Sequence, residues 1–115
     1  MPTIYNIETV KTNLEATQGD TILFSFNVTL NDVAFDMTGY QARMQVRRKD
    51  GLLIKDWMSY VSPADITITA DLLEFNTAGF TDYGIFNYDL QVTTPAGTVM
   101  TLMAGEFVVK KQFTP

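Results

Sequence analysis

Strict alternation of apolar and polar residues is the feature that most limits how this chain can fold. The clearest example covers residues 21–30, where every second side chain is apolar: Ile22, Phe24, Phe26, Val28 and Leu30. Successive side chains of a β-strand point to opposite faces, so a period of two collects these five on one side. We therefore expect a strand with one face buried and the other in solvent.

The same alternation recurs along the chain and is interrupted by turn residues. Further strands are predicted at residues 40–48, 52–58, 66–69, 72–76, 85–93 and 98–110, with a possible first strand in residues 4–14 and a bulge at Gly105. No segment has a convincing helical period. Short strands at this spacing are typical of sandwiches. We predict one all-β domain over residues 1–115, an immunoglobulin-like antiparallel β-sandwich of about seven or eight strands.

Composition agrees with a single folded domain. The chain has 115 residues, of which 46% are hydrophobic, including eight Phe, five Tyr and one Trp. That length leaves room for one core, and the apolar content is sufficient to fill it. There is no Cys, so neither a disulfide nor a thiolate-bound metal can hold the fold together. Burial of apolar side chains must stabilise it.

Several function classes are excluded or disfavoured by what the sequence lacks. The absence of His removes imidazole bases, Ser-His and Cys-His catalysis, and His-based zinc sites. No glycine-rich phosphate-binding motif is present. A net charge of −5 disfavours nucleic-acid binding. No apolar run is long enough to cross a membrane, and the first residues lack the pattern of a signal peptide, so we expect synthesis in the cytoplasm.

The carboxylates fall mainly at predicted turns: Asp20, Asp32, Asp36, Asp50, Asp65, Asp71 and Asp82. Asp is favoured at turns because its side chain accepts hydrogen bonds from the local backbone. No calcium-loop spacing is present among them. We therefore predict no catalytic residue, no cofactor and no metal site, and hence a protein that is not an enzyme.

The hairpin at Lys49-Asp50-Gly51 can be closed in two ways. A two-residue loop would place Val46 opposite Lys55 and turn that lysine toward the core, whereas a three-residue loop places Val46 opposite Ile54. We prefer the three-residue loop with Gly51 in a left-handed conformation. In this register Asp56 falls opposite Met44, so we expect the hairpin to leave the sheet near there.

The candidate contact surface follows from this register. Five of the eight basic residues fall between positions 43 and 55: Arg43, Arg47, Arg48, Lys49 and Lys55. In the preferred register Trp57 lies on the outer face opposite Arg43, with Leu53 and Ile85 near it. A Trp beside an Arg is typical of interface hot spots. The alternatives are that Trp57 is ordinary core and that the bases are solvated strand surface that resists aggregation.

The N-terminal run changes phase, since Tyr5 and Ile7 have one parity while Val10 and Leu14 have the other. Either a bulge reconciles the two halves, which we prefer, or residues 1–14 form an arm that pairs with a neighbouring chain through Tyr5 and Ile7. For Phe113, near the C-terminus, the same two alternatives apply: it belongs to the domain, or it contacts a neighbouring chain.

The segment Asp82-Tyr83-Gly84-Ile85-Phe86-Asn87-Tyr88 resembles the D-x-G-x-Y-x-C run that enters strand F of immunoglobulin domains. Phe86 stands in place of the corner tyrosine and Tyr88 in place of the cysteine. The corner hydrogen bond and the disulfide of that family are therefore both missing here. The turn residues and the aromatic core positions remain.

A wider resemblance covers nearly the whole chain from Gln18 onward. Its motifs are Gln18-Gly19-Asp20-Thr21 before an F-x-F strand, Phe35-Asp36-Met37-Thr38-Gly39-Tyr40, residues 42–47, residues 84–90 and Gly97-Thr98-Val99. In these the chain resembles small β-sandwich proteins of tailed bacteriophages, including the N-terminal domain of baseplate upper proteins and tail-fibre-associated domains. The resemblance implies a virion structural protein that attaches tail-fibre, baseplate or receptor-binding components. Its expected partners are other virion proteins and further copies of itself in a symmetric homo-oligomer.

Three other functions are compatible with a sandwich. A carbohydrate- or receptor-binding module would need a concave aromatic patch, for which Trp57, Tyr60 and Gln91 are the candidates. A capsid decoration protein would use the same kind of surface on the phage head. An acidic decoy of host nucleic-acid enzymes would mass its acids on one face, and the interleaved Arg43, Arg47 and Lys55 disfavour it.

Overall fold

The computed structural model describes residues 10–30 and 32–112, and all of their regular structure is β-strand. The strands are β1 (Val10–Lys11), β2 (Leu14–Thr17), β3 (Ile22–Asn27), β4 (Thr29–Leu30), β5 (Val33–Ala34), β6 (Gln41–Arg47), β7 (Leu53–Met58), β8 (Ile66–Thr69), β9 (Leu72–Thr77), β10 (Gly84–Thr93) and β11 (Val99–Lys110). Eight of them have four residues or more, which is the number expected from the alternation. Within the described ranges, no helix could span a membrane.

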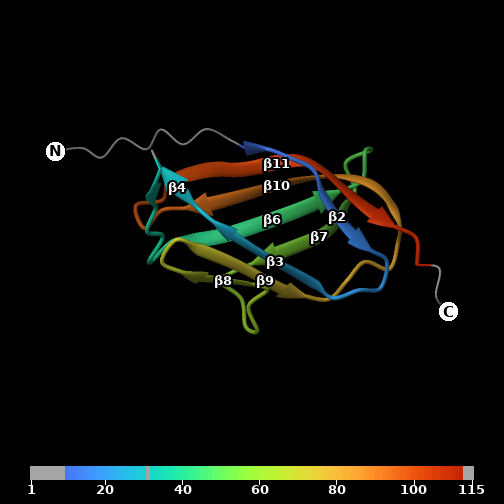
Figure 1. Cartoon of the computed structure of the whole chain (residues 1–115), viewed down its shortest axis with the longest axis horizontal. Coiled ribbons are helices and arrows are strands. Elements are labelled where there is room, and N and C mark those ends of the chain that lie inside the picture. The colour runs from blue at the N-terminus through green and yellow to red at the C-terminus, as the bar shows by residue number, and fades with distance from the viewer. Residues whose placement is uncertain (1–9, 31, 113–115) are drawn as a thin grey trace.

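Nine of the strands form two packed sheets, and β4 and β5 form a separate two-stranded hairpin (Figure 1). The larger sheet has the order β1-β11-β10-β6-β7, with β2 also paired to β11, and the smaller has the order β3-β9-β8. This places β3, β9 and β8 as strands B, E and D of an immunoglobulin-like sandwich, with β6, β10 and β11 as C, F and G. Only β1 and β2 pair in parallel with a neighbour, β11, among the described strands. The expected fold class is confirmed.

The core lies between the two sheets and is rich in aromatic rings. The inward residues of β6 and β10 are buried as the alternation predicts: Ala42, Met44, Val46, Phe86, Tyr88, Leu90 and Val92. Phe107 contacts the rings of Phe24, Trp57 and Tyr88 as well as that of Phe80, to which its ring centroid lies 5.0 Å away. Phe86 stacks on Phe80 with an interplanar angle of 9°. Phe86, which stands in place of the corner tyrosine, therefore packs in the aromatic core.

The predicted strand at 21–30 is interrupted at Val28. Its amide donates to the Asp71 carbonyl and its carbonyl accepts from Phe35, so the backbone leaves the β3–β9 ladder there. The last two residues instead form the β4–β5 hairpin. Ile22 still lies in the core, and Phe24, Phe26 and Val28 pack against it, while Leu30 is half-buried. The prediction of one continuous strand over residues 21–30 was therefore wrong, because the strand is divided into β3 and β4 at Val28.

The β6–β7 hairpin combines features of both predicted registers. Next to the turn, Arg47 pairs with Leu53 and Gly51 has φ of +96°, as the three-residue loop requires. The register then shifts between Arg47 and Val46, so that Val46 pairs with Lys55. The expectation that Val46 faces Ile54 was wrong, because one extra residue of β7 forms a bulge that moves every later side chain of that strand to the opposite face.

The bulge turns Lys55 inward at an exposed sheet edge. Its Nζ lies 5.7 Å from the centroid of the Phe80 ring, where the ring face attracts a cation. β7 is the outermost strand on its side of the larger sheet. A bulge and an inward-pointing charge both discourage another strand from pairing there.

The irregularity expected at Gly105 lies elsewhere. β11 bulges at Leu102, since Leu90 pairs with Met103 and Gln91 with Thr101. Gly105 pairs regularly with Tyr88, and its missing side chain has a different purpose. A Cβ atom there would overlap the carbonyl group of Thr12, which crosses directly over this position. Gly105 thus makes room for the N-terminal segment.

Candidate functional site

The candidate site is the solvent-facing surface of strands β10, β6 and β7, which we call the outer face. It is opposite the core side of the larger sheet. Strand pairing arranges its side chains in three cross-strand rows: Asn87, Arg47 and Leu53; Asp89, Gln45 and Asp56; Gln91, Arg43 and Met58. A row with two carboxylates therefore lies between two rows that each have one arginine.

The best-ordered contact of the outer face joins Arg43 to Asp56. The arginine Nε donates to Oδ1 at 2.8 Å and Nη2 donates to Oδ2 at 2.6 Å, which is a two-pronged ion pair. The hydrogen bond from Arg43 holds the pKa of the Asp56 carboxyl below its usual range, against the opposing effect of burial. The same hydrogen bond raises the pKa of Arg43. The pair presents a rigid, charged surface.

Two further basic side chains are anchored at the hairpin end. Arg47 donates from Nη1 to the Gly51 carbonyl at 3.0 Å and from Nη2 to Gln45 at 3.1 Å. Lys49 donates to Asn87 at 2.8 Å and to Glu106 at 2.6 Å, which connects the turn to β10 and β11. Hydrogen bonds within the protein therefore hold both of these long side chains.

Four of the seven residues predicted as partner contacts come together on this surface. Arg43 and Arg47 lie on the same side of β6, and Leu53 pairs with Arg47. Ile85 lies two residues before Asn87 on β10 and is 53% exposed, while Leu53 is 40% exposed. The outer face therefore has an apolar margin at its hairpin end. Tyr5, Ile7 and Phe113 lie outside the described residues.

Trp57 is not part of this surface, and its prediction as a contact was wrong. The bulge pairs it with Met44 in place of Arg43, so it points into the core with 3% exposure. Its ring lies about 6 Å from those of Phe75, Phe80 and Phe107. The carbohydrate patch predicted from Trp57, Tyr60 and Gln91 loses its central ring for the same reason. The alternative that Trp57 is ordinary core is confirmed.

Sequence reasoning missed Asp56, Gln45 and the Lys49–Glu106 pair. The preferred register placed Asp56 opposite Met44, so the hairpin was expected to leave the sheet near there, whereas β7 stays paired with β6 as far as Met58. A carboxylate in an apolar interior is costly, and that conflict was the available signal for a bulge. Nothing in the sequence links Lys49 to Glu106, which are separated by 57 positions.

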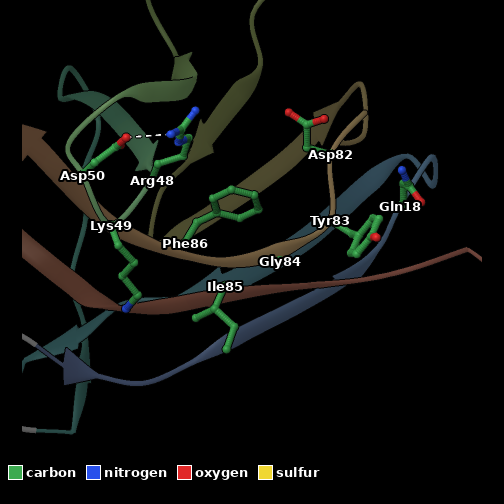
Figure 2. A pocket seen from close by; sticks show the side chains of 9 residues that line it. All are labelled: Gln18, Arg48, Lys49, Asp50, Asp82, Tyr83, Gly84, Ile85 and Phe86. Atoms are coloured by element: carbon green, nitrogen blue, oxygen red, sulfur yellow. Dashed lines mark hydrogen bonds and ion pairs between the residues drawn. The ribbon is translucent and has the colours of Figure 1, made fainter.

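A shallow, open pocket lies beside the hairpin end of the outer face. It has a volume of about 550 Å³ and lies between the β6–β7 turn and the start of β10. Figure 2 shows the Phe86 ring between the Arg48–Asp50 ion pair on one side and Asp82 with Tyr83 on the other. The Arg48 guanidinium is engaged by Asp50 at 2.6 Å. Within the described residues, no three acidic side chains approach closely enough to hold a metal ion.

Comparison with known proteins supports the fold. No protein-family model matches the sequence, and no curated protein matches it. Among solved structures, CopC from Methylosinus trichosporium OB3b superposes with a TM-score of 0.52 at 9% identity, over 89% of this chain and 88% of that one. The chain is an immunoglobulin-like β-sandwich. At this identity, the likeness to CopC concerns the fold alone.

Two other structures resemble this chain less closely. Extracellular domains 3–5 of Drosophila OTK give a TM-score of 0.39 at 21% identity, over 90% of this chain and 33% of that one. Murine CRIg gives 0.38 at 14% identity, over 87% of this chain and 92% of that one.

The Arg43–Asp56 pair gives a pH-dependent prediction. We expect Asp56→Asn to lower the free energy of unfolding by about 1 kcal/mol at neutral pH, because Arg43 loses its charged partner. The folded pKa of Asp56 lies below the ordinary value of 3.8, so its stabilisation is present above that value and lost as the pH falls through the folded pKa. The difference in free energy of unfolding between the unchanged chain and Asp56→Asn is measured by urea unfolding at neutral pH and at about pH 2.

The difference in free energy of unfolding between the unchanged chain and Asp56→Asn should therefore be smaller in acid than at neutral pH. The pKa of Asp36 is also lowered, by hydrogen bonds from Thr38, but this carboxyl is present in both proteins and cancels in the comparison. An equal difference at both pH values would show that the ion pair contributes nothing and that the substitution acts through packing.

Proposed function

We propose that this chain is a non-enzymatic structural protein of a bacteriophage virion. In this proposal it is synthesised in the bacterial cytoplasm and is then incorporated into the particle. It acts as an adaptor that attaches tail-fibre, baseplate or receptor-binding components through protein–protein contacts. The outer face provides those contacts, and the chain assembles into a symmetric homo-oligomer.

The observation that carries the proposal is the composition and order of the outer face. It combines two anchored arginines with carboxylates of neighbouring strands and has apolar side chains, Ile85 and Leu53, at its margin. Arginine is enriched at protein interfaces, so a face that presents two of them beside exposed apolar side chains is suited to protein–protein contact.

Charge distribution makes the outer face suitable for symmetric pairing. Arg43 and Arg47 lie on the outward side of β6. Asp89 lies beside them on the neighbouring strand β10, and Asp56 lies beside them on β7. In a two-fold interface the same patch of both copies meets, so the patch must hold both partners of each cross-subunit pair. The outer face meets that condition. The sequence resemblance from Gln18 onward supplies the virion context.

The proposal is tested by a double substitution on the outer face. We expect Arg47→Glu with Ile85→Asp to weaken association at least tenfold, since it reverses one charge and removes the apolar margin. Both side chains are exposed, so the fold should survive. The chain is co-expressed with the neighbouring structural proteins of its genome, and the complexes are measured by native mass spectrometry and by recovery in purified particles.

A matched control is Leu23→Asp on the outward side of β3, where Leu23 is 69% exposed. This variant should assemble as the unchanged chain does. An unchanged chain that stays monomeric and is absent from purified particles would contradict the adaptor function. If the chain is recovered with purified phage heads and not with tails, the adaptor function is wrong and the chain is a capsid decoration protein.

A further inference from the structure

The N-terminal segment Val10–Gln18 is a terminal element that the rest of the fold holds along one edge. β1 and β2 both lie beside β11 (Figure 1). Val10 pairs with Met103 and Leu14 with Phe107, so both strands keep the same offset of 93 positions although they are separated by Thr12 and Asn13. The segment therefore binds as one continuous strand in a single register.

The edge of β11 is shaped to recognise this segment. At its centre, Gly105 leaves space for the Thr12 carbonyl, which also accepts a 2.7 Å hydrogen bond from the Tyr88 hydroxyl. Tyr88 is only 4% exposed, so this hydroxyl is aimed at the segment from inside the core. The Asn13 side chain accepts from the Glu106 amide at 3.1 Å, where a strand carbonyl would otherwise bind. The Asn13 contact depends on the identity of that residue, whereas the contacts of Gly105 and Tyr88 are made to the main-chain carbonyl of Thr12.

The segment is nevertheless among the least deeply anchored strands. Its regular pairing is with β11 on one side. Leu14 and Ala16 are only partly buried against the core, and the Glu15–Lys110 ion pair is exposed. Edge elements with few buried contacts open at a lower free energy than the core does. Its covalent link to the rest of the domain is the turn at Gly19-Asp20, where Gly19 has φ of +86°.

We propose that the β11 edge also accepts the Val10–Gln18 segment of a second copy of this chain, so that neighbouring copies exchange their N-terminal strands. Exchange recreates every contact of the segment with Gly105, Tyr88 and Glu106 in the partner, and only the turn at Gly19-Asp20 must change conformation. Domain swapping of this kind is a low-cost route to dimers because no new interface has to be created. Reciprocal exchange between two copies gives a closed dimer.

A disulfide trap tests the exchange. The chain has no cysteine, so two introduced thiols can react only with each other. Glu15 and Val108 are paired across β2 and β11 with their side chains directed away from the core, which makes Glu15→Cys with Val108→Cys suitable. Within one chain this disulfide gives a cross-linked monomer, whereas after exchange it joins two chains. The full chain is oxidised over a range of concentrations and its mass is measured after denaturation.

We expect covalent dimers whose fraction rises with protein concentration. The control is Thr93→Cys with Val99→Cys on the β10–β11 hairpin, a pair that exchange of the N-terminal segment leaves within one chain. It should give monomers only. Cross-linked monomers alone in the Glu15/Val108 variant at every concentration would overturn the proposal. The exchange does not use the outer face, so loss of association in the Arg47→Glu, Ile85→Asp variant and loss of covalent dimers are separate results.

Discussion

Replacing Trp57 with alanine should lower the free energy of unfolding by about 3–5 kcal/mol, the range for removing a large buried aromatic side chain. Trp57 is 3% exposed and contacts the rings of Phe75, Phe80 and Phe107, which come from both sheets and from the corner between β9 and β10. No single neighbour can fill the space that the indole leaves. Because domains of this size have about 5–15 kcal/mol of stability, this loss is a large fraction of the total.

Urea unfolding followed by far-ultraviolet circular dichroism measures this effect, since the variant has no tryptophan left to report by fluorescence. Tyr60→Ala is the matched control because Tyr60 is an aromatic residue just beyond β7 with 46% exposure. It should cost less than about 1 kcal/mol. Similar losses in the two variants would mean that Trp57 lies on the surface and that the β7 bulge is absent.

The alternation of the sequence was sufficient to predict the strands and the fold class. Ile22, Met44 and Leu90 are buried where a period of two places them, because a half-exposed strand must separate its apolar and polar sides. Two packed sheets are the simplest way to bury eight such faces in one small domain. The register of β7 could not be predicted in the same way. One inserted residue reverses every later side chain, and its only local sign was the conflict at Asp56.

The outer face could be predicted in part. Arg43 and Arg47 share a side of β6 by simple alternation, and Leu53 and Ile85 followed from the strand assignments. The partners of these residues depend on contacts between positions far apart in the sequence. Lys49 with Glu106 is one example, and Tyr88 with Thr12 is another. Such pairs arise from the three-dimensional packing of strands, which a period of two does not specify.

The motif at residues 82–88 illustrates the same limit. Its aromatic residues were expected to fill the core, and Phe86 and Tyr88 are both buried. The hydroxyl missing from Phe86 has a counterpart on Tyr88, which donates to the N-terminal segment. Its raised pKa reflects burial, so the phenol stays protonated and remains a donor at neutral pH. The sequence pattern could not identify that acceptor, because Thr12 lies 76 positions away.

Replacing Gly79 with alanine should cost about 3 kcal/mol or more, because the backbone of another turn occupies the position of the new methyl group. A Cβ atom at Gly79 would overlap the Asp20 carbonyl oxygen and would lie 2.8 Å from the Asp20 carbonyl carbon and 3.1 Å from that of Gly19. These are main-chain atoms of the turn that joins β2 to β3, and the Gly19 amide is held by the Phe80 carbonyl at 2.9 Å. The turn can move away only by giving up that hydrogen bond.

Gly97→Ala separates this steric effect from the conformational freedom of glycine. Gly97 has φ of +93° and no atom within 4 Å of a Cβ placed there, so alanine is disfavoured only by its backbone conformation, at a cost of about 1 kcal/mol. Urea midpoints of the two variants should therefore rank Gly79→Ala well below Gly97→Ala. A lower urea midpoint for Gly97→Ala than for Gly79→Ala would mean that the turn joining β2 to β3 does not pack on Gly79. In that case the link that fixes the N-terminal strands against the smaller sheet is arranged differently.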